Sequence, residues 1–448
     1  MSEDPMDLPE PGDDLTAALE AHMRDRDMMT LRSVERVAAE RGVPAWLVGG
    51  PVRDLLLDRP VMDVDVMVEG DGVAFADGLA RSEGGKAIGY RRFGTALVVL
   101  SGGRKVDVAT ARTERYPEPG ELPEVVPGTL EEDLLRRDFG INAMAVRLGP
   151  DRFGAFTDPH GGRHDLEEGV VRVLHEDSFR DDPTRALRAV RFETRYGFTI
   201  EERTLVLLEE AVAEGMLETV SRQRIRDEIV LLLEEPGPAA PIRRLESTAI
   251  WSALMGEGTP LPGEVEALME EEAEAEAWYE QLPCRSDLGE VEGWVVRWLL
   301  LFERAGMDRA HEASESFHMG QAARRAAAAL ADRRDTALHF LQRTYHGTDS
   351  ALFEILRDFS PEAVLYLKTV SAANPYAPDR LERYLCRLEP TEPLVSGEDL
   401  KGLGMEPGPA MGELLERLFH AQLDGAFTSR EEALAEARRL IRRRDEGR

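Results

Sequence analysis

Hydrophobic residues are spaced differently in the two parts of this chain. In the first part, a short apolar run at 45–48 predicts a buried strand, and a periodic segment at 70–82 predicts a helix. Residues 96–100 and 105–109 flank a Ser-Gly-Gly-Arg turn and predict a β-hairpin. Beyond Glu201 the spacing is almost entirely helical. The pattern therefore predicts a first part that contains strands and a helical remainder.

Further segments complete the first part of the chain. Residues 1–28 are acidic and contain prolines near their start, which predicts a disordered tail. Helices are predicted over 30–41 and 130–137. The basic segment 84–93 and the Pro- and Gly-containing segment 117–128 predict loops, the first of them mobile.

A glycine pair and two aspartates follow the first apolar run closely. Gly49 and Gly50 allow a turn whose backbone N–H groups are open to an anion, and the helix expected over 52–57 attracts phosphate at its N-terminus. Asp63 and Asp65 point to one face of a strand, where paired carboxylates suit a Mg²⁺ ion bound to a nucleoside triphosphate. A lone Gly-Gly is usually a turn and a lone Asp-x-Asp is usually solvated. Their close succession predicts a phosphate site beside a two-metal site.

A third carboxylate, Asp107, lies in the second strand of the predicted hairpin. If that strand neighbours the strand of Asp63 and Asp65, about 4.8 Å away, Asp107 can act as general base or share a metal ion. The alternative is a solvent-facing strand residue. After the helix at 130–137, Arg137 and Asn142 can bind triphosphate and sugar oxygens, although adjacent arginines are also common surface charge.

A second group of polar residues lies at the start of a predicted helix. Asp182 precedes Pro183, the order expected of an N-cap and the first helical residue. Arg185, Arg188 and Arg191 follow at spacings of three and form one ridge of the helix. A capped helix with a solvated arginine stripe is one interpretation. In the other, Asp182 and Arg185 recognise the donor–acceptor edge shared by cytosine and adenine, and the other two arginines hold phosphates.

Composition limits the classes of protein to consider. With 42% hydrophobic residues and no apolar run near the ~20 residues of a membrane span, the chain has the composition of an ordinary soluble protein. Its net charge of −31 argues against general nucleic-acid affinity but permits a local basic site. The start of the chain lacks the features of a signal peptide. Cys284 and Cys386 lack metal-ligand spacing, so we expect buried thiols in a reducing cytoplasm.

Five motifs in this order resemble one family, the class II tRNA nucleotidyltransferases, which include CCA-adding enzymes and bacterial poly(A) polymerases. A later segment, 397–425, also resembles the end of some members. The five motifs are Leu-Val-Gly-Gly-Pro-Val-Arg-Asp at 47–54, Asp-Val-Asp at 63–65, Arg-Arg-Asp-Phe-Gly-Ile-Asn-Ala at 136–143, Asp-Asp-Pro-Thr-Arg-Ala-Leu-Arg-Ala-Val-Arg-Phe at 181–192 and Ser-Arg-Gln-Arg-Ile-Arg-Asp-Glu at 221–228.

The resemblance implies an α+β protein with a nucleotidyltransferase head, built on a small mixed sheet, and an all-helical neck, body and tail. After the acidic tail, the expected boundaries are 29–170 for the catalytic head, 171–235 for the base-recognising neck, 236–345 for the body and 346–448 for the tRNA-binding tail.

The resemblance also implies a role for each matched residue. Asp63 and Asp65 would ligate Mg²⁺, and Asp107 would be the third catalytic carboxylate. Two departures are Gly140, where the family usually has Thr, and Asp181, where it often has Glu. The nucleotide, CTP or ATP, would be bound by Gly49, Gly50, Arg53, Arg137, Asn142, Asp182, Arg185, Arg188 and Arg191.

The implied function is the addition of C and/or A residues to the 3′ end of tRNA, with release of pyrophosphate, by a cytoplasmic enzyme without a membrane partner. The amino-acid sequence of 106–123 is similar to that of family members that are separate A-adding enzymes, so a dedicated A-adding or CC-adding enzyme is an alternative. A poly(A) polymerase, a small-molecule nucleotidyltransferase and a non-catalytic nucleotide- or RNA-binding regulator are further alternatives.

Overall fold

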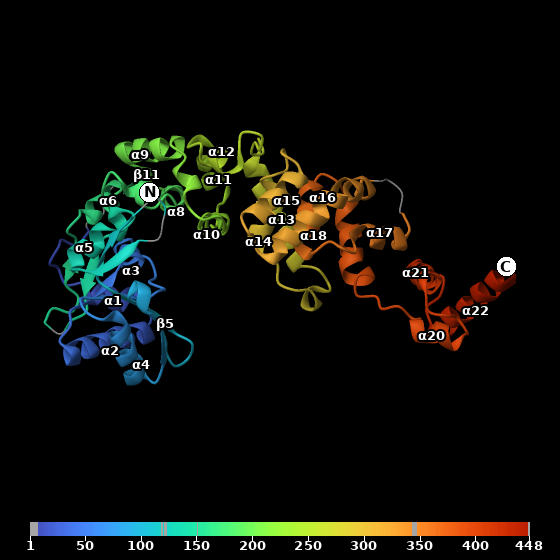
Figure 1. Cartoon of the computed structure of the whole chain (residues 1–448), viewed down its shortest axis with the longest axis horizontal. Coiled ribbons are helices and arrows are strands. Elements are labelled where there is room, and N and C mark those ends of the chain that lie inside the picture. Colours follow the sequence, from blue (N-terminus) through green and yellow to red (C-terminus); the bar gives the residue numbers. More distant parts are fainter. Residues whose placement is uncertain (1–7, 118–119, 121–122, 150, 343–346, 447–448) are drawn as a thin grey trace. The chain divides into compact units, whose positions relative to one another are not determined.

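The computed structural model describes residues 8–117, 120, 123–149, 151–342 and 347–446. It divides into two compact units, Met1–Leu254 (unit 1) and Met255–Arg448 (unit 2). Figure 1 shows the strands in the first of these and the largely helical second unit. The finer boundaries expected for head, neck, body and tail remain a prediction.

Unit 1 is built around a mixed seven-stranded sheet with the order β3-β4-β5-β2-β1-β8-β9. Only β2 and β5 run parallel; the other neighbouring pairs are antiparallel. The predicted mixed sheet and the hairpin of β4 and β5 are therefore confirmed. The strands are β1 Ala45–Val48, β2 Asp65–Val68, β3 Lys86–Tyr90, β4 Thr95–Val99, β5 Lys105–Thr110, β8 Ala145–Arg147 and β9 Phe156–Thr157.

Two short ribbons accompany this sheet. One pairs β6 Arg112–Arg115 with β7 Glu124–Pro127, and the other pairs β10 Val170–Val171 with β11 Thr199–Ile200. The helices of unit 1 are α1 Thr16–His22, α2 Asp25–Arg41, α3 Gly50–Leu56, α4 Gly72–Glu83, α5 Leu130–Leu135, α6 Gly162–Glu168, α7 Ser178–Asp181, α8 Arg185–Tyr196, α9 Glu202–Ala213, α10 Arg222–Leu233, α11 Ala239–Ser247 and α12 Ile250–Met255, which crosses the boundary.

The two faces of the seven-stranded sheet are covered differently. On one face, α2 and α4 pack together against the strands and bury the alternate apolar residues, such as Val98 and Val108 (Figure 1). On the other face, a buried cluster that includes Trp46, Met67 and Leu134 covers only the part near β1 and β2. The sheet thus keeps a covered half and an accessible half on this second face.

Every secondary-structure element that the structure describes in unit 2 is a helix, as predicted for the chain beyond Glu201. Among the helices that the structure describes, none combines the length and the apolar character needed to cross a membrane. The helices of unit 2 are α13 Val265–Glu280, α14 Gly293–Leu300, α15 Met307–Ser316, α16 Gln321–Leu341, α17 Asp349–Leu356, α18 Pro361–Val370, α19 Ala377–Arg383, α20 Gly397–Gly402, α21 Pro409–Leu423 and α22 Arg430–Glu446.

Four expectations are corrected. Residues 8–28 are not disordered, because Leu15 and Leu19 are buried around α1; residues 1–7 lie outside the described residues. The predicted loops at 84–93 and 117–128 contain β3 and β7, whose exposed positions left no apolar alternation to detect. The cysteines are not thiols: folding of unit 2 brings Cys284 and Cys386 within 5.3 Å, Cα to Cα, as a disulfide.

Candidate active site

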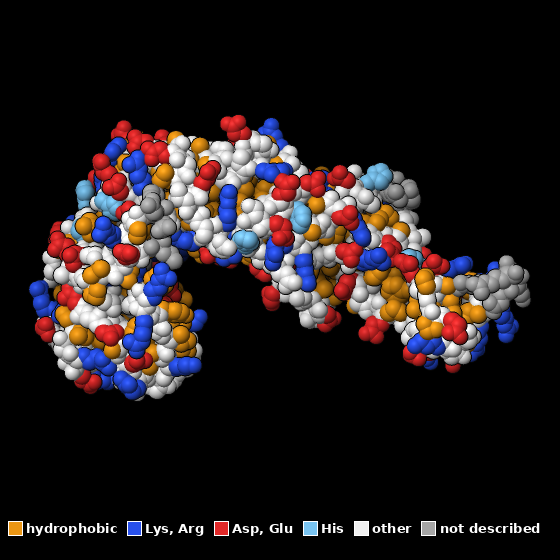
Figure 2. Space-filling view, in the orientation of Figure 1, with side chains coloured by type: hydrophobic (Ala, Val, Ile, Leu, Met, Phe, Trp, Pro, Cys, Tyr) orange, Lys and Arg blue, Asp and Glu red, His pale blue; other side chains and the backbone are white. Residues whose placement is uncertain are grey.

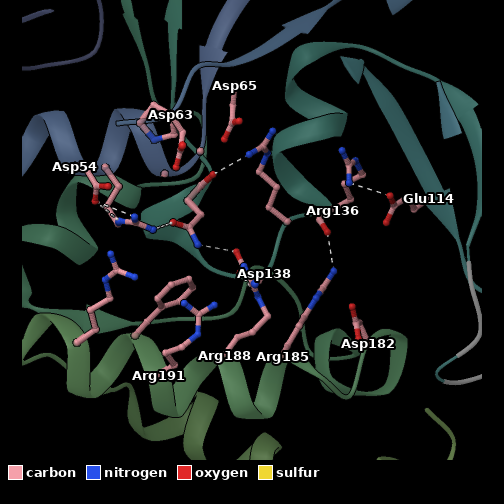
Figure 3. A pocket seen from close by; sticks show the side chains of 18 of the residues that line it. Asp54, Asp63, Asp65, Glu114, Arg136, Asp138, Asp182, Arg185, Arg188 and Arg191 are labelled. Carbon is pink, nitrogen blue, oxygen red and sulfur yellow. Dashed lines mark hydrogen bonds and ion pairs between the residues drawn. The ribbon is translucent and has the colours of Figure 1, made fainter. Parts of the chain in front are cut away.

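A cavity of about 940 Å³ lies in unit 1, where the end of β1 and the start of β2 meet α8. Figure 3 shows acidic side chains of the strand ends on one wall and arginines of α8 on another. Among the predicted site residues, Asp107 alone does not line the cavity. The cavity is lined by Gly49, Gly50, Arg53, Asp63, Asp65, Arg137, Asn142, Asp182, Arg185, Arg188 and Arg191, among others.

Three aspartates gather at the strand ends, and we call Asp63, Asp65 and Asp107 the strand-end carboxylates. Asp65 and Asp107 are directly paired across the parallel strands β2 and β5, so the condition that the sequence analysis set for a third carboxylate is met. Asp63 lies just before β2 and not within it, so the prediction that one strand carries both members of Asp-x-Asp is wrong. Burial and the negative charges of Asp107 and Asp63 raise the pKa of Asp65 to about 6. Clustered like charges of this kind favour a cation between them.

A divalent cation fits this cluster. Carboxylate oxygens are the ligands that hard cations such as Mg²⁺ prefer. Burial and repulsion by the neighbouring carboxylates make the ionised form of Asp65 unfavourable and so raise its pKa. A bound cation would offset that repulsion. Asp63 and Asp65 line the cavity and would hold the ion, and burial together with Asp63 also raises the pKa of Asp107.

The glycine turn leaves space for an arginine whose charge acts on Asp65. Gly49 has φ +76°, a left-handed conformation that favours glycine, and it ends β1 just before α3 begins at Gly50. A Cβ at Gly49 would lie 2.7 Å from Nη1 of Arg137, so the guanidinium occupies the space of a side chain. Arg137 also donates to Asp133. Its Nε is buried and has no hydrogen-bond partner among the described residues.

A chain of polar contacts joins α3 to α8. Arg53 donates to Oδ1 of Asn142 at 2.6 Å, and Nδ2 of Asn142 donates to Oδ1 of Asp138 at 2.9 Å. Arg188 donates through Nε and Nη2 to the other oxygen of Asp138. Burial alone would raise the pKa of Asp138, but the charge of Arg188 and the hydrogen bond from Asn142 lower it to about 2. Asp138 is therefore ionised throughout the physiological range.

The same chain continues from α8 to α10. Glu228 accepts from Arg188 at 3.2 Å and from Arg191 at 3.3 Å. The side chain of Arg191 is only 8% exposed, and its Nε has no hydrogen-bond partner among the described residues. The alternative of a solvated arginine stripe is thus wrong. We call Arg53, Asn142, Asp138, Arg188, Glu228 and Arg191 the arginine network.

The remaining pair, Asp182 and Arg185, lies at the start of α8. Asp182 is not the N-cap: it ends α7, Thr184 precedes α8, and Oδ1 of Asp182 accepts from the Thr184 hydroxyl at 2.7 Å. Its other oxygen accepts from Arg224 at 2.6 Å. Arg185 donates to Oγ of Ser178 at 2.6 Å and to the backbone oxygen of Arg136 at 2.8 Å. Both groups are held in place, and each retains capacity for another hydrogen bond.

Sequence reasoning did not assign roles to three residues of this site: Asp138, Arg224 and Glu228. The sequence did show that Asp138 directly follows two arginines and that Glu228 lies on a predicted amphipathic helix. Their partners are 40 to 50 residues away along the chain, which no local pattern reveals.

Known families and proteins match this architecture. The family described as "Poly A polymerase head domain" matches residues 45–172, and "Probable RNA and SrmB- binding site of polymerase A" matches 197–259. An A-adding tRNA nucleotidyltransferase of Halalkalibacterium halodurans is 32% identical over 439 residues, which cover 96% of both proteins. The chain belongs to the class II tRNA nucleotidyltransferases.

Other members of the class II tRNA nucleotidyltransferases differ in length. The A-adding tRNA nucleotidyltransferase of Geobacter sulfurreducens is 34% identical over 428 residues, which cover 94% of this chain. This chain spans 48% of that relative, about half of its length. A solved CCA-adding enzyme in an apo form has 32% identity and a TM-score of 0.78, with 96% of this chain and 99% of the other covered. The predicted family and fold are confirmed.

Proposed function

We propose that this chain extends the 3′ end of tRNA with nucleotides taken from ATP, from CTP or from both, and releases pyrophosphate. The observation that carries the proposal is one cavity that joins the strand-end carboxylates to the arginine network and to the pair Asp182 and Arg185. Carboxylates suit a metal-assisted attack on phosphorus, and guanidinium groups suit a triphosphate. A nucleotide-binding regulator would need the guanidinium groups but not the carboxylates.

Each set of residues has a distinct task in this proposal. Arg137 and Arg191 bind triphosphate oxygens, which would satisfy their buried Nε groups. Asp182 accepts from the exocyclic amine of the base, and Arg185 donates to a ring nitrogen, a combination that fits adenine and cytosine. Asn142 binds sugar oxygens, and Arg53 fixes the orientation of Asn142.

The chemical step exchanges one phosphate ester bond for another. The 3′-terminal hydroxyl oxygen forms a bond to the α-phosphorus, the bond to the leaving pyrophosphate breaks, and Asp107 accepts the hydroxyl proton. Mg²⁺ held by Asp63 and Asp65 would supply Lewis-acid stabilisation of the triphosphate charge. Arginines on the α8 wall stabilise the departing pyrophosphate.

Addition of the terminal A alone is the finer function that we favour. It is supported by the A-adding relatives of H. halodurans and G. sulfurreducens. Complete CCA addition is the second candidate, because a CCA-adding enzyme shares the fold over nearly the whole chain. We infer a cytoplasmic location for either activity, since tRNA is the proposed substrate.

The test uses tRNA transcripts that end before the CCA tail, after its first C and after CC, each with single labelled nucleotides and Mg²⁺. ATP transfer to the CC end alone would establish an A-adding enzyme. Additional CTP transfer to the two shorter ends would establish a CCA-adding enzyme, and CTP transfer alone a CC-adding one. Long A tracts on any RNA would indicate a poly(A) polymerase. No transfer at all would contradict the proposal.

A further inference from the structure

Side chains that are paired across neighbouring strands form rows on the sheet, and one such row connects the strand-end carboxylates to an accessible sheet face. Asp65, Asp107, Leu97 and Ile88 are paired in sequence across β2, β5, β4 and β3. Directly paired residues point to the same face of a sheet. The row therefore runs from the carboxylates over apolar side chains to the edge strand, about 14 Å away at three strand spacings.

Two further rows flank it on the same face. One contains Lys105 of β5, Val99 of β4 and Lys86 of β3, and the other contains Thr95 and Tyr90. We call these residues, together with Leu97 and Ile88, the open sheet face. In Figure 2, basic and hydrophobic side chains adjoin on unit 1 near the position that β5 has in Figure 1.

The opposite face of these strands is covered by α4. A Cβ at Gly89 of β3 would lie 2.6 Å from Val73 of α4, so the residues next to Gly89 point away from that helix. Those residues remain accessible: Ile88 is 41% and Tyr90 56% exposed. Large exposed apolar and aromatic side chains beside a cluster of carboxylates indicate an interaction surface.

The charge of the open sheet face differs from that of the chain. The protein has a net charge of −31 and only four lysines, at 86, 105, 368 and 401. Two of these four, Lys86 and Lys105, belong to the open sheet face, and Arg91 and Arg92 follow β3 directly. In the part of the chain that the structure describes, none of Lys86, Lys105, Arg91 and Arg92 forms a salt bridge, although the charge of Lys105 acts on the neighbouring Asp107. Unpaired cations on an acidic protein are complementary to a polyanion.

We propose that the open sheet face binds the single-stranded 3′ end of the RNA acceptor and delivers its terminal hydroxyl to Asp107. Single-stranded nucleic acid is bound by aromatic stacking together with cations along the backbone, and Tyr90 with Lys86 and Lys105 supplies both. Asp107 lies on this face but outside the nucleotide cavity, which suits a proton acceptor on the acceptor side. The proposal rests on the function proposed above and adds the residues that hold the acceptor.

A purely structural explanation predicts a different result. A lysine on an edge strand, such as Lys86 of β3, also prevents pairing with other sheets, and in that role it would not affect RNA. The discriminating quantity is the KM for tRNA, compared with the KM for the nucleotide. Substitutions on the open sheet face should change the KM for tRNA but not the KM for the nucleotide, because Lys86, Tyr90 and Lys105 do not line the nucleotide cavity.

The experiment measures steady-state addition to the tRNA end that the wild-type protein extends best. Tyr90→Ala should raise the KM for tRNA about tenfold, the scale of one lost base stack. The double variant Lys86→Ala/Lys105→Ala should weaken tRNA binding and reduce the magnitude of the slope of log Kd against log salt by about 1.4, since each single-strand phosphate contact contributes about 0.7. The KM for the nucleotide should stay within about twofold in both variants.

The control is Arg81→Ala, an exposed cation of α4 on the covered side of the sheet. It should change neither the KM for tRNA nor the salt slope. If Tyr90→Ala and the double lysine variant also leave both quantities unchanged while the wild-type protein transfers nucleotides, the acceptor site is wrong and the proposed function stands. A wild-type protein that extends no tRNA would overturn both proposals.

Discussion

The two walls of the cavity differ in how their charged side chains are paired. On the α8 wall, buried cations are paired with carboxylates: Arg188 lies between Asp138 and Glu228, and Arg191 contacts Glu228. On the strand-end wall, carboxylates adjoin one another, and the pKa of Asp65 is raised to about 6 by burial and by its acidic neighbours. On the first wall, carboxylates of the protein neutralise most of the buried charge, although Nε of Arg191 has no hydrogen-bond partner among the described residues. On the second wall, Arg137 offsets the charge of Asp65 only in part, and a metal ion would supply further positive charge.

This difference separates positioning from chemistry. A paired, buried network holds its side chains in fixed positions, which is what recognition of a base requires. A cluster of like charges is unfavourable by itself and becomes favourable when a cation and a triphosphate bind. Changes to the two walls should therefore give different defects.

The largest effect is expected on the strand-end wall. Asp63→Ala should lower the rate of nucleotide transfer by about a thousandfold or more, because it removes a proposed metal ligand. The thermal unfolding midpoint should be unchanged or slightly raised, since one member of a repulsive cluster is lost. Single-turnover transfer and a thermal melt of the same preparation measure both quantities.

Breaking the arginine network should affect the fold as well as activity. Asp138→Asn keeps the shape but leaves Arg188 without its charged partner at this position, which should cost about 3 kcal/mol of unfolding free energy. Urea unfolding measures this loss. Asp227→Asn is the matched control, because that carboxylate is 63% exposed and its ion pair should contribute little.

The pH dependence of the stability difference between wild type and Asp138→Asn tests whether the charge of Asp138 causes it. Since the pKa of Asp138 is about 2 in the folded protein and 3.8 ordinarily, its contribution to stability is complete above pH 3.8 and is lost as the pH falls toward 2. The difference between wild type and Asp138→Asn should thus be constant from pH 8 to pH 5. A difference that disappeared between pH 7 and pH 5 would indicate another group.

A smaller effect is expected in the segment that holds the network. Gly140 lies between Asp138 and Asn142, and a Cβ there would lie 2.1 Å from Oδ2 of Asp165. The other oxygen of that carboxylate, Oδ1, accepts from Nε of Arg172 at 2.8 Å. Gly140→Ala should cost about 1–3 kcal/mol of unfolding free energy, as overpacking does. This contact also gives a physical reason for a glycine where the family usually has Thr.

Two further variants test the cause of this smaller effect. Gly237→Ala, whose added Cβ would have no neighbour within 4 Å, is the control and should be close to neutral. In the double variant Gly140→Ala/Asp165→Ala, the two losses should sum to more than the measured loss. Strict additivity would show that the two sites do not contact each other.

Local pattern predicted the parts of the molecule in which neighbours in sequence are neighbours in space. The hairpin of β4 and β5 was predicted because strand periodicity and a short turn determine its register. The position of Asp107 beside Asp65 was only a condition in the sequence analysis, because it depends on the separate pairing of β5 with β2. Gly49 was predicted because only a few residues accept its backbone conformation.

The rest depended on distant partners. The contacts of Asp138 and Glu228 with Arg188 span 50 and 40 residues, and the disulfide spans 102. The edge strand β3 is largely exposed, so its residues show no alternation of apolar and polar types that would predict a strand. The helix α1 lies in an acidic, Pro-containing segment whose few leucines become informative only when their burial is known.

One paired measurement tests the separation of chemistry from recognition most directly. Single-turnover transfer of each of the four nucleotides is compared for Asp65→Asn and Asp182→Asn. Asp65→Asn should lower the rate with every nucleotide and preserve the preference of the wild-type protein for its own substrates, ATP or both ATP and CTP, over UTP and GTP. Asp182→Asn should reduce that preference by about 100-fold while keeping most of the maximal rate. If Asp65→Asn altered base preference, or Asp182→Asn lowered all rates equally, the assignment of the two walls would be contradicted.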